Sequence, residues 1–322
     1  MTLPDAQDRL EHFPISFFAA VLGLAGLTLA LHAASALLPL AGAASSVMLG
    51  VTVIAFLAIG AVYARKALRH PAAVAAEWQH PVKLAFFPAI SISLMLIATA
   101  LAPDRPDIAR PLWLLGAVLQ AGLTLAVVSC WIGHRPFQPM HISPAWFIPA
   151  VGNVVVPVAG PSLGFVELSW LFFSAGLMFW AVLLTLVMNR LIFHDPLPGR
   201  LLPTLAILIA PPAVGFLSWL SLNGGQVDAG GRLLLNLAYV FAAIVAMQAP
   251  KFLNLPFALS WWALSFPVAA LTIASLRFGA LAGSAFHTGL GLALLALLVV
   301  IVAALMLRTG RAIAARQICL PE

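Results

Sequence analysis

The chain has 322 residues, of which 63% are hydrophobic and only 8% are charged, with a formal net charge of +6. A soluble globular domain usually has about 25% charged residues, so this composition excludes a soluble protein and predicts one that crosses a membrane many times. No basic run with interleaved aromatic residues indicates a nucleic-acid partner. Cys130 and Cys319 are far apart, so the sequence predicts no disulfide framework, metal site or other cofactor.

Ten apolar segments are candidates for membrane spans, because a helix needs roughly 20 residues to cross the hydrocarbon core. Runs of this length are helical, since the strands of a barrel would be shorter and would alternate in polarity. The sequence therefore predicts an all-α integral membrane protein. The expected helices are 14–38, 43–64, 83–102, 111–133, 145–160, 168–189, 201–222, 233–249, 256–276 and 286–307.

The lysines and arginines of the short loops predict the orientation. If the N-terminus lies inside, most of them fall on the cytoplasmic side, as the positive-inside rule requires. Both termini are then cytoplasmic, and the expected location is the cell (inner) membrane. The longest loops, around 65–82 and 134–144, are too short to fold alone, so residues 1–322 are expected to form a single transmembrane domain with the lipid bilayer around it. The acidic start of the chain does not resemble a cleaved signal peptide.

Prolines fall inside the odd-numbered segments, except for the first, which has them only at its ends, and only at the ends of the even-numbered ones. Because proline is a common cause of helix kinks, the pattern predicts five pairs, each with a kinked odd helix and a straighter even helix. Such an alternation favours an inner ring of odd helices around a central pathway and an outer ring of even helices. The prolines expected to kink helices that line the pore are Pro88, Pro149, Pro157, Pro211, Pro212 and Pro267.

The apolar segments contain almost no charge. Charged residues inside membranes usually mark ion pathways or proton relays, and here Glu167 and His32 lie only near segment ends. The sequence thus argues against an enzyme and against a proton-relay pump. Among the remaining polar residues, the serines Ser91 and Ser265 are expected to bond their own preceding carbonyls. The amide of Asn153 either joins neighbouring helices or faces water in a pathway.

Phe266 precedes Pro267 in the ninth segment, LPFALSWWALSFPVAALTIAS. Most of the twenty phenylalanines must be packing or lipid-facing residues. Phe266, however, shares its helix face with alanines at spacings of three and four, such as Ala263 and Ala270. A large ring among small residues, beside a kink, could project into a pathway and close it by excluding water.

Four stretches of the chain resemble the tellurite-resistance/dicarboxylate transporter family, which includes plant guard-cell slow anion channels and bacterial TehA-type proteins. FPISFFAAVLGLAGL is similar to the family's first helix, FIPAVGNVVVP to its fifth and ELSWLFFSAGLMFW to its sixth. WWALSFPVAALTIAS is similar to its ninth helix and is the most specific of the four. The resemblance covers essentially all ten segments.

This resemblance implies five tandem helical hairpins in a quasi-five-fold ring, with odd helices lining a pore in each protomer of a homotrimer. It places the gating phenylalanine at Phe266. Where the family often has a glycine facing the gate, this sequence has Ala19. Ala19, Ser91, Asn153 and Ser265 are the candidate pore-lining residues.

The expected function is an anion channel of low selectivity for small inorganic or organic anions. The alternative is a proton-coupled transporter or exporter of dicarboxylate, sulfite or tellurite, for which Glu167 and His32 are the only titratable candidates. A non-conducting membrane scaffold is the third possibility.

Overall fold

The computed structural model describes residues 6–133, 137–253 and 255–320, and all the regular elements in these ranges are helical. Nine of them are long and apolar enough to cross a membrane, and Pro144–Val158 is a shorter apolar helix. In chain order the segments are η1 and α2 (Ile15–Ala33), α3 (Ala41–Arg69), η2 and α5 (Lys83–Leu101), α6 (Pro106–Ile132), η4, α7 and η5 (Pro144–Val158), α8 (Val166–Phe193), η6 and α9 (Gly199–Leu222), α10 (Ala229–Leu253), η7 and α11 (Leu259–Ala282) and α12 (Ala285–Ala314).

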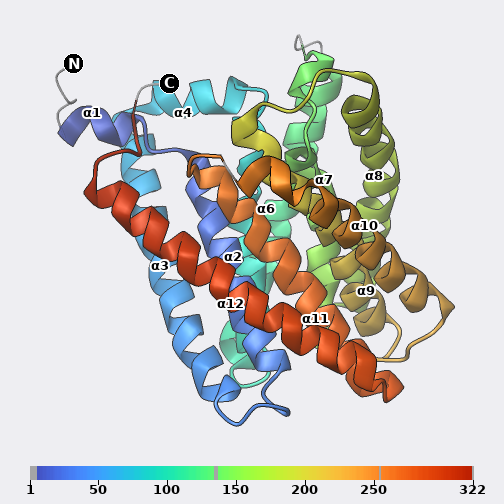
Figure 1. Cartoon of the computed structure of the whole chain (residues 1–322). Helices are drawn as coiled ribbons and strands as arrows, with labels where there is room; N and C mark the ends of the chain where they lie inside the picture. Colours follow the sequence, from blue (N-terminus) through green and yellow to red (C-terminus); the bar gives the residue numbers. More distant parts are fainter. Residues whose placement is uncertain (1–5, 134–136, 254, 321–322) are drawn as a thin grey trace.

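Each of the ten expected helices has a counterpart, but several boundaries differ. The first was expected to reach residue 38 but ends at Ala33, and turns at residues 34–37 follow before Pro39. The second extends beyond residue 64 to Arg69. Two short helices were not expected, α1 (Ala6–Glu11) and α4 (Pro71–Gln79). Both lie at the end of the molecule that also carries the two chain termini (Figure 1).

The segments alternate between the interior and the periphery. In the apolar stretches of the first, third, seventh and ninth segments, 61–78% of residues are buried, whereas the figure is 11–33% in α3, α6, α8, α10 and α12. The fifth segment, Pro144–Val158, is also almost entirely buried. We call the five odd-numbered segments the inner segments and the five even-numbered helices the outer helices.

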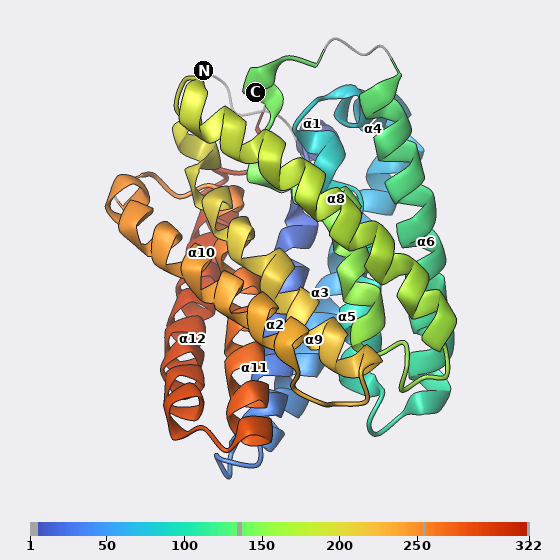
Figure 2. The same ribbon diagram turned by 90° about the vertical axis from the view of Figure 1, so that its right-hand side faces the viewer.

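Contacts between elements connect the inner segments in a closed circuit. Helix α2 contacts α5, α5 contacts η5, η5 contacts α9, α9 contacts α11, and α11 returns to α2. Each inner segment also packs on the outer helix that follows it in the chain, so the molecule consists of five consecutive hairpins. Figures 1 and 2 show where this circuit closes: α2 and α11 lie next to each other, and α3 and α12 flank them.

The inner segments begin as 3₁₀-helices and continue as α-helices. The change occurs after Phe17, Phe86, Ile209 and Leu264, and the fifth segment alternates between the two forms. Runs of 3₁₀-helix longer than three or four residues are uncommon, yet η6 extends over Gly199–Ile209. A 3₁₀-helix rises about 2.0 Å per residue, compared with 1.5 Å in an α-helix, so the inner segments cross the same thickness with fewer residues.

The prolines expected to cause kinks mostly occupy these junctions. Pro88 precedes the first residue of α5, Pro211 and Pro212 follow the first residue of α9, and Pro267 is the third residue of α11. Proline is tolerated in the first turn of an α-helix, where an N–H group has no partner within the helix, so it does not carry the penalty of about 3 kcal/mol for an interior position. Pro149 is the third residue of α7, whereas Pro157 lies near the end of η5.

The expected confinement of prolines to odd segments was too strict. Because α6 begins at Pro106 and α10 continues to Leu253, Pro111 and Pro250 lie inside outer helices. Both remain within the first or last two turns. The outer helices therefore keep uninterrupted α-helical backbone through their central parts, and the mixed 3₁₀ and α geometry is a property of the inner segments.

A buried ion pair fastens the beginning of the first inner segment to α3 and α4. Lys66 Nζ lies 3.0 Å from Glu77 Oε2, and the two side chains are 2% and 7% exposed. Tyr63 donates its hydroxyl proton to Glu77 Oε2 at 2.8 Å, and the Ile15 amide donates to Glu77 Oε1 at 3.2 Å. Lys66 also donates to the Phe13 carbonyl at 2.8 Å. Sequence reasoning did not predict this pairing, because both residues fall within the loop that was expected around 65–82.

Removal of one partner of this pair should destabilise the protein strongly. A Glu77→Ala substitution leaves Lys66 buried without its counter-charge, a change that typically costs about 3–5 kcal/mol. The double substitution Lys66→Met with Glu77→Leu removes both charges and should recover much of the lost melting temperature of the purified protein in detergent. Arg105→Gln is the control, because the pair of Arg105 with Asp107 is exposed to solvent, where an ion pair contributes little to stability. Equal melting temperatures for Glu77→Ala and the control would contradict this role.

Candidate functional site: the contact between helices α2 and α11

Phe266 is the second residue of α11, immediately after the change from the 3₁₀-helix η7 to α-helix. Its ring is half-buried, whereas the adjacent Ser265 and Pro267 are buried. Ser265 donates its hydroxyl proton to the Trp262 carbonyl at 2.6 Å, which satisfies one backbone acceptor at the junction. The junction thus fixes the backbone on both sides of Phe266 and leaves the aromatic ring partly accessible.

Two glycines of α2 bring that helix close to α11 beside Phe266. A Cβ atom built on Gly23 would lie 2.1 Å from Ser265 Oγ and 2.9 Å from Trp262 Cε3. A Cβ atom on Gly26 would lie 2.7 Å from Ala269 Cβ and 3.6 Å from Phe266 Cδ2. These distances leave no room for a side chain at either glycine. The α2 backbone therefore forms one wall of the surroundings of Phe266.

Ala19 lies one helical turn before Gly23 and on the same face of α2. It is buried and belongs to the apolar cluster that includes Trp261 and Trp262. Trp262 Nε1 donates to Thr309 Oγ1 of α12 at 3.0 Å, so η7 is attached to the outer helix. The structure places Gly26 beside the Phe266 ring, a neighbour that was not predicted from the sequence.

Ser91 and Asn153 belong to a buried polar network on the other side of the inner circuit. Ser91 is bonded to Gln120 Oε1 at 2.7 Å and also donates to the Pro88 carbonyl at 2.8 Å. Gln120 and Thr124, from outer helix α6, both donate to the Pro149 carbonyl. Sequence reasoning missed these two residues, although their spacing of four places them on one helix face.

Asn153 connects the same network to the fifth segment. Its amide nitrogen donates to the Ala150 carbonyl at 2.7 Å, and its oxygen accepts from Thr124 Oγ1 at 3.3 Å. The neighbouring Val154 carbonyl accepts from the Ser218 hydroxyl of α9. Asn153 is 2% exposed, and Ser91 and Ser265 are fully buried. All three are thus bonded within or between helices, and the pore-lining role expected for them stays a prediction.

Charges are absent from the middle of the inner segments in the part of the chain that the structure describes. Among the described residues of the whole molecule, the buried charged ones are Lys66 and Arg190, in the last turns of outer helices, and Glu77 in α4. Arg190 donates to the Asp195 carbonyl. Glu167 and His32, the titratable residues considered for proton coupling, are exposed at helix ends. An anion that passed among the inner segments would meet apolar side chains and helix backbone, with no fixed charge at mid-depth.

Comparison with known proteins identifies the family of this chain. The sequence profile of the voltage-dependent anion channel family matches residues 12–310, and so includes all ten segments apart from the last residues of α12. The chain belongs to the voltage-dependent anion channel family. The expected relationship to slow anion channels and TehA-type proteins is thereby confirmed.

Three relatives illustrate the range of this family. An uncharacterized transporter of Methanocaldococcus jannaschii is 27% identical over 81% of this chain and 83% of its own length. The tellurite resistance protein TehA homolog of Haemophilus influenzae is 28% identical over 82% of this chain and 81% of its own. The S-type anion channel SLAH3 of Arabidopsis thaliana is 28% identical over 80% of this chain, but that match spans only 41% of the plant protein.

Substitution of Gly23 tests the close contact between α2 and α11 in this family member. Gly23→Ala places a methyl group 2.1 Å from Ser265 Oγ, and overpacking of this kind typically costs about 1–3 kcal/mol. We expect a lower melting temperature for the purified protein. Gly60→Ala is the matched control, since nothing lies within 4 Å of a Cβ atom there and alanine favours the helix. A Gly23→Ala variant as stable as the control would show that the two helices do not pack this closely.

Proposed function

We propose that this multi-pass membrane protein is an anion channel of low selectivity, in which small anions pass among the inner segments. The observation that carries the proposal is the closed circuit of five buried segments without charge at mid-depth, in a chain of the voltage-dependent anion channel family. A pathway without strong binding sites lets ions leave as readily as they enter, as conduction requires. We propose a quasi-five-fold arrangement of the hairpins and a homotrimer on the basis of the family resemblance.

We further propose that Phe266 closes this pathway at rest. Its ring is partly accessible within a buried helix turn, and it lies beside the close contact that Gly23 and Gly26 of α2 make with α11. An aromatic ring in a narrow apolar passage excludes water, and an anion cannot cross a dry constriction without losing its hydration. Rotation of a single side chain would open such a passage without moving the helices.

The electrostatic contribution comes from the end of the molecule that carries both termini. Arg65 and Arg69 near the end of α3 and Arg9 in α1 lie there. We propose that this end is cytoplasmic, in accord with the positive-inside rule. The positive potential of that face would raise the local concentration of anions near the pathway.

A Phe266→Ala substitution should increase anion conductance. We expect chloride and nitrate currents in liposomes or oocytes to rise roughly ten-fold or more, which corresponds to about 1.4 kcal/mol removed from the barrier. Phe286→Ala is the matched control, because that ring is 73% exposed on outer helix α12. Conductance at background level in a well-folded Phe266→Ala protein would exclude Phe266 as the gate.

The alternative function is proton-coupled transport or export of dicarboxylate, sulfite or tellurite. The similarity to a relative named for tellurite resistance is the reason to test it. Coupling requires a titratable group in the pathway, but Glu167 and His32 are both exposed at helix ends. We therefore expect anion flux in reconstituted liposomes to follow the membrane potential and to remain unchanged when a pH gradient is imposed. Saturable uptake that depends on the pH gradient, and that is lost in Glu167→Gln or His32→Gln, would favour the transporter.

A further inference from the structure

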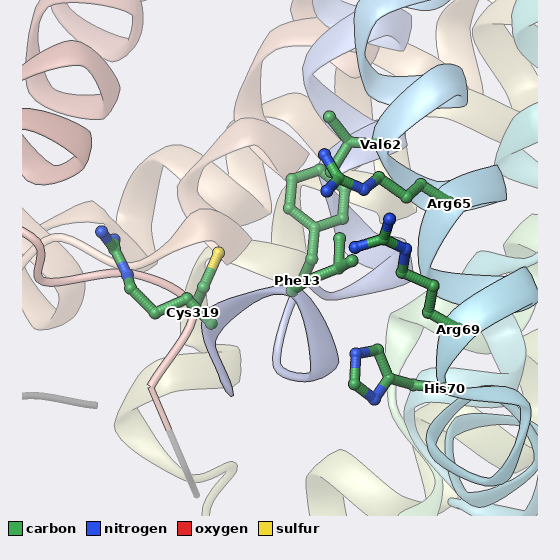
Figure 3. Close-up of a pocket in the computed structure, with 8 residues that line it drawn as sticks. Phe13, Val62, Arg65, Arg69, His70 and Cys319 are labelled. Carbon is green, nitrogen blue, oxygen red and sulfur yellow. The ribbon is translucent and has the colours of Figure 1, made fainter. Parts of the chain in front are cut away.

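A pocket of about 560 Å³ opens beside the end of α3, on the side of the molecule where the termini lie. Figure 3 shows Arg65, Arg69 and His70 extending from the α3 end toward the segment that carries Phe13, with Cys319 of the C-terminal tail on the opposite side. The described residues that line it are Arg9, Leu10, Phe13, Val62, Arg65, Arg69, His70 and Cys319.

The polar lining of this pocket is basic. Three arginine side chains, from α1 and α3, line it, and the lining residues that the structure describes include no carboxylate. In the described parts of the chain, neither Arg65 nor Arg69 forms an ion pair or a side-chain hydrogen bond. The nearby Glu77 is engaged by Lys66, Tyr63 and the Ile15 amide, so it does not neutralise the pocket.

Helix electrostatics alone would explain only part of this cluster. Basic residues in the last turn of α3 interact favourably with the helix dipole and with the cytoplasmic side of a membrane. Arg9 comes from a different element, and its Nε atom is buried without a hydrogen-bond partner in the described structure. Arg9 Nη2 donates to the Ile318 carbonyl at 3.1 Å, which holds the C-terminal tail beside the pocket. A buried donor without a partner, in a pocket lined by two further arginines that form no ion pair in the described structure, indicates that an anionic acceptor belongs there.

We propose that this pocket binds a phosphate-bearing anion, which joins α1 and the C-terminal tail to the end of α3. Guanidinium groups bind phosphate oxygens through pairs of parallel hydrogen bonds, and three of them match a doubly charged group better than a halide. The volume falls within the range of about 300–1,000 Å³ typical of small-molecule sites. Leu10, Phe13 and Val62 supply apolar contacts for the carbon skeleton of the ligand.

Two sources can supply this chemistry. Val62 and Leu68, on the same helix, are 38% and 85% exposed on an outer helix, so the pocket lies near the level of lipid headgroups in the proposed orientation. A phospholipid would place its headgroup phosphate among the arginines with its acyl chains along α3. A soluble phosphate ester would enter from the aqueous side. The site is separate from the proposed pathway, so it can be tested whether or not the protein conducts.

The test measures binding to the purified full-length protein with one probe of each source. Dioctanoyl phosphatidylglycerol is the lipid probe, with dioctanoylglycerol as its phosphate-free control, and glycerol phosphate is the soluble probe. We expect the double variant Arg65→Gln with Arg69→Gln to bind at least ten-fold more weakly than the wild type. Arg311→Gln with Arg316→Gln is the matched control, because it removes two exposed arginines near the same terminus that do not line the pocket.

The pattern of binding identifies the source. If only the lipid probe binds in an arginine-dependent way, the ligand is a lipid headgroup. If only glycerol phosphate does, the ligand is a soluble phosphate ester. If both do, the pocket recognises the phosphate group itself. If neither probe binds, or if the Arg65 and Arg69 variant binds as tightly as the control, the proposal is wrong.

A second measurement needs no change in the arginines. Cys319 is half-buried in the lining, and burial raises the pKa of its thiol while the charges of Arg9 and Lys66 oppose that rise. In a Cys130→Ser background, Cys319 is the only thiol. A bound phosphate should slow the labelling of Cys319 by a maleimide. At a probe concentration that fills most of the pockets, we expect the labelling rate to fall by roughly several-fold or more. Unchanged labelling at saturating concentrations of both probes would overturn the proposal even if the arginine variants fail to fold.

Discussion

Backbone amides in a hydrocarbon core have no water to bond, and this constraint governs the architecture of the protein. The outer helices satisfy it with continuous α-helical hydrogen bonding. The inner segments satisfy it with a change from 3₁₀ to α geometry, and prolines such as Pro211 and Pro267 lie in the first turn after that change. A backbone of this mixed kind is tolerated at membrane depth only where protein surrounds it, which is why the irregular segments are the buried ones.

Association of the hairpins depends on close packing, because apolar side chains gain little by leaving lipid for protein. Glycines occur at many of these contacts. Gly116 of α6 meets Met95 of α5, and Gly291 of α12 meets Leu276 of α11, each with no space for a side chain. The contact of α2 with α11 follows the same rule and lies beside Phe266. The helix packing around the proposed gate therefore leaves little room for movement of any group except the phenylalanine ring.

Polar groups complete the structure where packing alone is insufficient. Gln120 and Thr124 carry hydrogen bonds from an outer helix to the carbonyl of Pro149, and Glu77 joins three chain segments at one end of the molecule. A polar group without a hydrogen-bond partner is costly in a medium of low polarity. Each of these bonded residues therefore defines the register of the elements that it connects. The Nε atom of Arg9, in the pocket that Arg65 and Arg69 also line, is buried without a hydrogen-bond partner in the described structure, and a bound anion would supply one.

The sequence by itself determined the membrane class, the ten segments to within a few residues at most boundaries, and the family, because hydrophobic length, proline position and local motifs are properties of consecutive residues. It also pointed to Phe266 and Asn153 as residues of interest. Only the tertiary structure decided that Gly26 adjoins the Phe266 ring, that Gln120 and Thr124 bond Pro149, and that Lys66 and Glu77 are a buried pair. These contacts join residues on different helices, and their distances depend on packing that no single segment encodes.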